Sequence, residues 1–208
     1  MKVILLNGSP REKGCTYTAL SILASRLEEN GVEAELIHIG SGPIQGCVGC
    51  IQCITNGHVC AFDNDKVNEV LAKVKAADGL VLGSPVYCGS VTGPFTAFLN
   101  RLFHAGNMGG AFAFKVGASV VSTRRSGATT TLDVLNRYFA VSNMIEISGQ
   151  GLVHGGKPED VYADEEGVQI MRQTADKMAW VLKCIQAGKL AGIDHPVPEK
   201  KIRTGFHR

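Results

Sequence analysis

Residues 3–20 read VILLNGSPREKGCTYTAL, and they contain the clearest indication of the fold. Its first four residues are continuously apolar, which is typical of a strand that helices cover on both faces of a parallel sheet. A polar, glycine-bearing loop follows over residues 7–18 and leads into the first helical pattern. A buried strand, a loop and a helix in this order predict the first unit of an open α/β sheet.

The same alternation continues along the chain. Further apolar runs lie at residues 32–39, 80–82, 116–121 and 144–147. Apolar residues at helical spacing predict helices that include residues 20–27, 67–74, 95–103, 132–139 and 168–185. Strands joined by such helices require right-handed crossovers, so the sequence predicts a doubly wound parallel sheet with helices on both faces.

The composition excludes several classes of protein. Of the 208 residues, 45% are hydrophobic and 19% are charged, and 21 basic against 19 acidic residues leave a formal charge of +2. So small a charge provides no strong field for nucleic acid or for an anionic membrane. The sequence contains no apolar stretch of membrane-spanning length and no complete signal-peptide core. We therefore expect a globular, cytoplasmic protein without nucleic-acid or membrane partners.

Three polar loops follow predicted strands, over residues 7–18, 83–93 and 122–131. In an open parallel sheet, ligands bind beyond the carboxyl ends of the strands. The first loop offers hydroxyl groups, Arg11 and the free amides of a helix start, which suit a phosphate, although it matches neither the P-loop nor the G-x-G-x-x-G pattern. The other two loops offer glycines and Tyr87 to a flat heterocycle. Together the loops indicate a mononucleotide site.

These loops resemble the three flavin loops of the NADPH-dependent FMN reductase family, which has a flavodoxin-like fold. The resemblance extends over roughly residues 1–190 and includes the sequence FLNR at 98–101. It implies a three-layer α/β fold whose five-stranded parallel sheet has the order 2-1-3-4-5. We expect a single FMN-binding domain over 1–190 with a cysteine-rich insertion at 40–62, followed by a C-terminal tail at 191–208.

The resemblance also implies the residues that bind FMN. They are Ser9, Pro10, Arg11, Cys15, Thr16 and Thr18 near the phosphate, Pro85, Val86, Tyr87, Cys88, Gly89, Ser90 and Val91 along the isoalloxazine ring, and Thr123, Arg124, Arg125 and Gly127 on a further wall. Two positions depart from the family: Cys15 stands where Asn is common, and Ala128 where a second glycine is frequent. The resemblance implies that NADH or NADPH reduces FMN, which passes electrons to a flavin, a quinone or another small acceptor. Because the cofactor carries the chemistry, we assign no catalytic acid, base or nucleophile.

Four of the seven cysteines form the pattern C-x2-C-x2-C-x6-C at Cys47, Cys50, Cys53 and Cys60. Closely spaced thiolates of this kind can surround an iron-sulfur cluster, whereas structural zinc more often uses two separated pairs. The pattern resembles that of iron-sulfur flavoproteins, a branch of the same superfamily, and this implies that the four cysteines hold a 4Fe-4S cluster. A loop without a cluster and a redox-active dithiol of Cys50 and Cys53 are the alternatives.

Three functions therefore compete. The leading one is an FMN-dependent NAD(P)H oxidoreductase. The second is an electron carrier that exchanges single electrons with a ferredoxin-like protein through a 4Fe-4S cluster. The third is a binding module that keeps the fold and has lost the flavin. The resemblance also implies a homodimer or homotetramer with the flavin near a subunit boundary.

Overall fold

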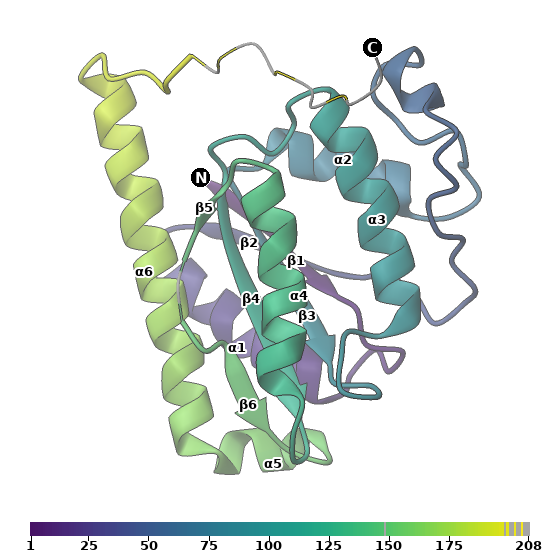
Figure 1. Cartoon of the computed structure of the whole chain (residues 1–208). Helices are drawn as coiled ribbons and strands as arrows, with labels where there is room; N and C mark the ends of the chain where they lie inside the picture. Colours follow the sequence, from purple (N-terminus) through teal and green to yellow (C-terminus); the bar gives the residue numbers. More distant parts are fainter. Residues whose placement is uncertain (148, 198, 200–201, 203–204, 206–208) are drawn as a thin grey trace.

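A computed structural model describes residues 1–147, 149–197, 199, 202 and 205 of the chain. Strands and helices alternate through most of it (Figure 1). The strands are β1 (Lys2–Asn7), β2 (Glu33–His38), β3 (Gly79–Pro85), β4 (Val116–Thr123), β5 (Ile145–Glu146) and β6 (Leu152–His154). The helices are α1 (Cys15–Glu29), α2 (Val67–Ala76), α3 (Gly93–Met108), α4 (Ala128–Val141), α5 (Pro158–Ala163) and α6 (Glu165–Leu190), with a short 3-10 helix η1 (Gln52–Ile54).

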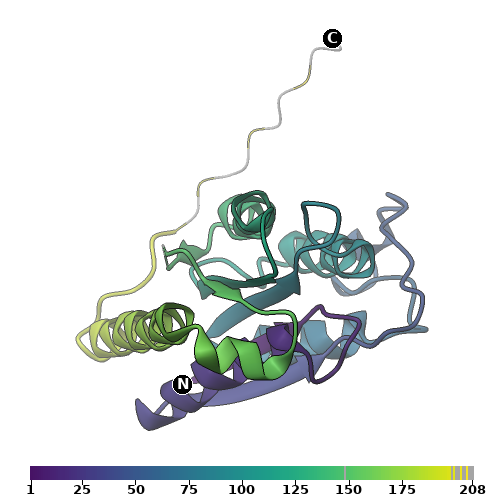
Figure 2. The same ribbon diagram turned by 90° about the horizontal axis from the view of Figure 1, so that it is seen from below.

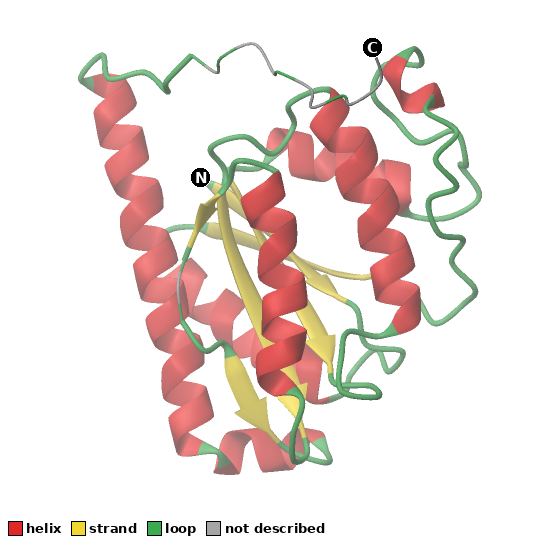
Figure 3. Cartoon of the chain, in the orientation of Figure 1, coloured by secondary structure: helices red, strands yellow, loops and turns green. Residues whose placement is uncertain are grey.

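The strands form one parallel sheet in the order β2-β1-β3-β4-β5, as predicted (Figure 3). The fifth position differs in one respect from the single strand expected at 144–147. Two short strands share the outer edge of β4, because β5 pairs with Val116 and Gly117 while β6 pairs with the last residues, Val121 to Thr123. The second piece brings the chain to the carboxyl edge of the sheet.

Helices cover both faces of the sheet (Figure 2). Ile4 and Leu6 of β1 face a core shared with α2, α3 and α4. Val3 and Leu5 point the other way, into a core shared with α1, α5 and α6. Successive residues of a strand point to opposite faces, so a strand buried on both sides is apolar throughout. This explains the continuous apolar run at residues 3–6.

Residues 40–62, which we call the cysteine segment, have no regular structure except η1. The segment runs beside α3 on the outside of the molecule before the chain enters α2 (Figure 1). Part of the predicted tail at 191–208 lies outside the described residues, namely 198, 200–201, 203–204 and 206–208. Among the helices of the described ranges, none is both long enough and apolar enough to cross a membrane.

Candidate functional site

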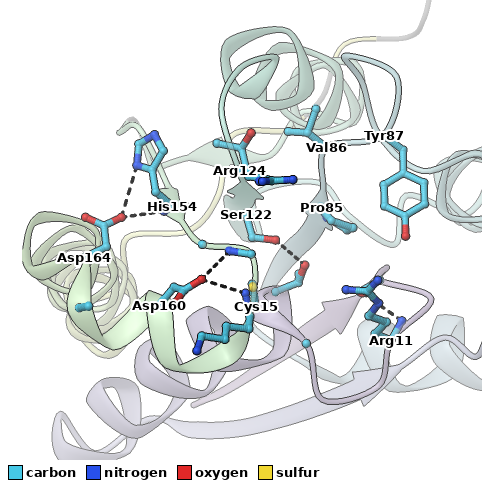
Figure 4. Close-up of a pocket in the computed structure, with 18 residues that line it drawn as sticks. Arg11, Cys15, Pro85, Val86, Tyr87, Ser122, Arg124, His154, Asp160 and Asp164 are labelled. Atoms are coloured by element: carbon cyan, nitrogen blue, oxygen red, sulfur yellow. Dashed lines mark hydrogen bonds and ion pairs between the residues drawn. The ribbon is translucent and has the colours of Figure 1, made fainter.

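A cavity of about 1010 Å³ opens at the carboxyl edge of the sheet, beyond β1, β3, β4 and β6 (Figure 4). Its volume is at the upper end of the range for ligand pockets, roughly 300–1,000 Å³. We call it the edge cavity. Four loops line it through Ser9, Arg11, Gly14, Cys15 and Thr16, then Pro85, Val86 and Tyr87, then Ser122, Thr123 and Arg124, and finally His154, Gly155, Gly156, Lys157, Asp160, Ala163 and Asp164.

The loop after β1 is fixed by its own hydrogen bonds. The backbone N–H of Ser9 donates to Asn7 Oδ1 at 3.0 Å, and the N–H of Arg11 donates to Ser9 Oγ at 3.1 Å. Asn7 Nδ2 donates to the carbonyl of Glu12 at 2.9 Å, and His38 Nε2 donates to the carbonyl of Ser9 at 2.8 Å. These hydrogen bonds set the shape of the loop, which leaves Arg11 exposed at the cavity.

The N-terminus of α1 meets the same cavity. No side chain caps this helix, its N-cap is Gly14, and its first turn contains no acidic residue. Free amides and the helix dipole at such an end favour an anion. Thr16 Oγ1 lies 2.8 Å from Ser122 Oγ, which links α1 to β4 across the cavity floor. Burial raises the pKa of the Cys15 thiol, so this side chain adds no negative charge near neutral pH.

The loop after β3 contains a tight turn over residues 87–90. Tyr87 and Ser90 exchange both backbone hydrogen bonds, at 2.8 and 3.0 Å. The two central residues have positive φ, 50° for Cys88 and 77° for Gly89, as a type I′ turn requires. The turn projects Tyr87 beside the cavity, where its side chain is 47% exposed. An aromatic ring is therefore available to stack on a ligand.

Gly127 joins the loops after β3 and β4. It precedes α4 with a φ of 86°, and a Cβ at this position would lie 2.8 Å from Val86 Cγ1 and 2.9 Å from Gly89 Cα. Only a glycine fits both the backbone conformation and the contact. The two walls expected for a flat ring are thus packed against each other at a residue without a side chain.

The loop after β6 is a part of the site that the sequence did not reveal. The N–H of Gly155 donates to the carbonyl of Thr123 at 3.0 Å, which continues the β4–β6 pairing into the cavity wall. Asp160 accepts from the N–H groups of Gly156 and Lys157 at 2.9 and 3.1 Å. The available signal was the apolar pair Leu152-Val153, with two glycines after His154, and an apolar pair is too short to identify as a strand.

Asp164 supports this loop from the start of α6. Its Oδ2 accepts from the N–H of His154 at 2.6 Å, and its Oδ1 accepts from the N–H of Gly167 at 3.0 Å. Desolvation acts to raise the pKa of Asp164, but these hydrogen bonds outweigh it, and the net result is a pKa below the usual range. The imidazole Nδ1 of His154 lies 3.4 Å from the same carboxylate and is held at the cavity rim (Figure 4).

The expected FMN-binding residues fall into three groups. Nine line the edge cavity: Ser9, Arg11, Cys15, Thr16, Pro85, Val86, Tyr87, Thr123 and Arg124. Cys88, Gly89 and Arg125 line a hollow of about 310 Å³ that shares Val86, Thr123 and Arg124 with the cavity. The others do not line the edge cavity: Pro10 lies in a neighbouring recess, Ser90 belongs to the tight turn, Val91 is buried, Thr18 donates its hydroxyl to the carbonyl of Gly14, and Gly127 packs between the loops.

The four cysteines of the cysteine segment line one small recess against α3. Cys47 and Cys50 are exposed, Cys60 is half-buried and Cys53 is buried. The chain reaches this arrangement through residues in the left-handed region, including Ile51 with a φ of 55°. A β-branched residue rarely adopts such a conformation, and backbone strain of this kind is concentrated at functional sites.

The recess offers four cysteine thiols as possible ligands, from Cys47, Cys50, Cys53 and Cys60. In the part of the chain that the structure describes, no three His, Cys, Asp or Glu side chains are placed to hold a single metal ion. Four thiolates are the donor set that iron-sulfur clusters use, and four thiolates can also bind zinc.

Known proteins resemble this chain in sequence and in fold. Residues 1–157 match the family described as NADPH-dependent FMN reductase. An iron-sulfur flavoprotein of Methanocaldococcus jannaschii is 32% identical over 195 residues, which cover 89% of this chain and 100% of the relative. An iron-sulfur flavoprotein of Methanosarcina thermophila is 27% identical over 191 residues, which cover 91% and 99% of the two chains.

Solved structures share the fold at low sequence identity. A WrbA-like flavodoxin of Agrobacterium tumefaciens superposes with a TM-score of 0.62 at 15% identity, over 88% of this chain and 98% of the other. The order of the sheet and the loops at its carboxyl edge agree with this likeness. The family match covers the first three of the four loops that line the edge cavity and the beginning of the fourth. The chain therefore belongs to the NADPH-dependent FMN reductase family and is a flavoprotein oxidoreductase.

Proposed function

We propose that this protein binds FMN in the edge cavity and transfers a hydride from NADH or NADPH, through the flavin, to a small acceptor such as a flavin or a quinone. The main support for the proposal is that three features line one cavity. They are the uncapped N-terminus of α1, the loop that contains Arg11, and the tight turn that begins with Tyr87. The family supports FMN as the cofactor. The choice of electron donor and acceptor is part of the proposal.

One end of the edge cavity fits the phosphate of FMN. The α1 N-terminus, the hydroxyls of Ser9 and Thr16 and the guanidinium of Arg11 line it together. A phosphate carries between one and two negative charges near neutral pH and prefers such donors. Because the thiol of Cys15 is kept neutral by burial, this side chain does not oppose the charge of the phosphate.

The part of the edge cavity beside the loops after β3 and β4 fits a flat ring. Val86 and Tyr87 offer apolar and aromatic surface, and Arg124 lies next to Val86 (Figure 4). The contact at Gly127 keeps the two loops at a fixed separation. These residues would orient the isoalloxazine and exclude water from the part of it that they cover, which is the role of the protein in a cofactor enzyme.

When bound, FMN would supply a two-electron redox centre whose N5 atom can take up a hydride. We assign no side chain of the chain a proton transfer in that exchange. The chain contributes binding and orientation, since its loops are held by hydrogen bonds to the side chains of Asn7 and Ser9 and by backbone hydrogen bonds between loops. Lys157 and the ring of His154 also line the cavity and are available to the phosphate groups of a dinucleotide donor.

Anaerobic reduction tests the proposal. The purified protein should contain FMN, and mixing with NADH or NADPH should remove the absorption band of the oxidised flavin. Arg11→Gln should weaken FMN binding about tenfold, because a charge-assisted hydrogen bond is worth about 1.5–3 kcal/mol in a protected site and less at a surface. Lys13→Gln is the matched control, since Lys13 lies in the same loop but does not line the cavity. A colourless protein that takes up no FMN would contradict the proposal.

A second function is supported by the cysteine recess. We propose that Cys47, Cys50, Cys53 and Cys60 hold a 4Fe-4S cluster, so that the protein also exchanges electrons with a ferredoxin-like partner. Similarity to iron-sulfur flavoproteins over most of the chain supports this assignment. A bound cluster transfers single electrons, and the cysteines provide the thiolates that hold it.

Iron and sulfide analysis after anaerobic purification separates the two functions. Stoichiometric iron and sulfide that disappear in Cys53→Ser would support the cluster. Cys184→Ser is the matched control, because Cys184 is exposed on α6 and does not line the recess. Flavin bands without iron would leave the NAD(P)H oxidoreductase as the function and remove the cluster.

A further inference from the structure

Arg101 is a charged side chain buried in the core of the protein. It lies on α3 with only 1% of its surface exposed, and it is among the largest fully buried side chains. A buried guanidinium is unfavourable unless it is paired and its N–H groups are hydrogen-bonded. The hydrogen-bond partners of Arg101 therefore indicate which part of the chain this side chain stabilises.

All partners of the Arg101 guanidinium belong to the cysteine segment or directly follow it. Its Nη2 donates to the carbonyl of Phe62 at 2.6 Å, and its Nη1 contacts the carboxylate of Asp65 and the carbonyl of Gln45. Its Nε donates to the sulfur of Cys60 at 3.1 Å. One guanidinium thus connects the chain before Cys47 to the chain after Cys60 and directs one N–H to a cysteine sulfur.

His104 lies one turn further along α3 and also lines the cysteine recess. Residues three apart on a helix lie on the same face, so Arg101 and His104 approach the recess together. The Nε2 atom of His104 is buried and has no hydrogen-bond partner among the described residues. A buried nitrogen without a partner calls for an explanation, and a missing ligand is one.

We infer that Arg101 and His104 form a pair of hydrogen-bond donors that α3 presents to the sulfur atoms of the iron-sulfur cluster, and that this pair raises the reduction potential of the cluster. The inference rests on the second function proposed above. Arg101 is a positioning residue that holds Cys60, and His104 Nε2–H is the donor that a cluster in the recess would satisfy. Together we call them the α3 donor pair.

The physical reason is electrostatic. Reduction of the cluster adds one electron, supplied by a ferredoxin-like protein or a chemical reductant, and forms or breaks no bond. The added charge lies beside a buried guanidinium, where the low dielectric makes their attraction strong. Hydrogen bonds to the sulfurs stabilise the reduced state further, so both members of the pair favour reduction.

Potentiometric titration of the anaerobically purified protein tests the α3 donor pair. Arg101→Gln and His104→Leu should each make cluster reduction about tenfold less favourable, which corresponds to about 59 mV for one electron. The FMN in the same molecule provides an internal reference whose potential should change much less. The electron paramagnetic resonance spectrum of the reduced cluster should change in both variants.

Conservative and control variants distinguish this role from support of the fold. Arg101→Lys keeps the charge and His104→Gln keeps a donor, so each should show a smaller shift in the cluster potential. They are used in place of Arg101→Gln and His104→Leu if one of those variants fails to fold. Arg26→Gln removes a guanidinium that pairs with Asp176 far from the recess, and His58→Gln removes an equally unpartnered ring nitrogen that does not line it.

The outcomes are separable. Unchanged cluster potentials in both α3 variants, or equal shifts in the Arg26 and His58 controls, would overturn the inference while the cluster stands. A wild-type protein without iron would overturn the proposed cluster and the inference with it. Shifts confined to the α3 variants support both.

Discussion

Backbone hydrogen bonds join the neighbouring loops of the edge cavity to one another, whereas side chains join the cysteine recess to the rest of the fold. Adjacent cavity loops are joined through Gly8 N–H to the carbonyl of Gly83 at 2.8 Å and through Val86 N–H to the carbonyl of Ser122 at 3.0 Å. At the recess, Arg101 reaches across to the cysteine segment, and Asn68 exchanges two hydrogen bonds with the backbone of Cys60 at 2.8 and 2.9 Å. A site built from strand ends inherits its shape from the sheet, while a site on irregular chain needs dedicated anchors.

The strongest test of this difference removes the recess anchor. Arg101→Leu leaves the carboxylate of Asp65 without its buried partner, and the loss of one member of a buried pair costs about 3–5 kcal/mol. Urea unfolding of the cluster-free protein should show this decrease in the free energy of unfolding. Arg26→Leu is the control, since Arg26 and Asp176 are 38% and 41% exposed and such exposed pairs contribute little to stability. Equal losses in the two variants would show that Arg101 is not an anchor.

At the edge cavity, the matching test disrupts the contact between the loops after β3 and β4. Gly127→Ala places a Cβ against Val86 and Gly89 at a positive φ, and we expect a loss of about 2 kcal/mol in stability with weaker FMN binding. Gly110→Ala has the control geometry, because its φ is 67° but nothing lies within 4 Å of the added Cβ. Urea unfolding and FMN titration measure the two effects. If Gly110→Ala weakened FMN as much, the loop contact would have no role in binding.

Two threonines on α1 test which of the predicted FMN-binding residues contribute to binding. Thr16→Val removes the buried hydrogen bond to Ser122 and should cost about 1–2 kcal/mol of stability, with a loss of FMN affinity of about tenfold. Thr18→Val removes a hydroxyl that donates to Gly14 and does not line the cavity, so FMN affinity should change less than about threefold. Isothermal titration with FMN compares them. A larger loss of affinity in Thr18→Val would support the role that the family resemblance implies for it.

The sequence predicted the parts of the molecule that local pattern controls. The run at residues 3–6 and the glycine-bearing loops after it identified the sheet and three of the four cavity loops. His154 and Lys157 were not predicted as site residues, because β6 is only three residues long and its pairing with β4 depends on long-range contacts. Thr16 and Thr18 have the same side chain two positions apart, and only the turn of α1 decides which of them faces the cavity. The contact of Arg101 with Cys60 joins residues 41 positions apart and leaves no local pattern.

The smallest expected effect concerns Asp164, which anchors the fourth cavity loop. Its pKa is lowered in the folded state, so its contribution to stability is present above the pKa of the unfolded chain, about 3.9, and is lost as the pH falls through the folded value. Asp164→Asn keeps one acceptor for two N–H groups and should cost about 1 kcal/mol at pH 7. The difference between wild type and variant should shrink below about pH 4, as urea unfolding at several pH values would measure. A difference that stayed constant down to acid pH would mean that the carboxylate charge does not hold this loop, and the edge cavity would then rest on the backbone contacts of β4 and β6 alone.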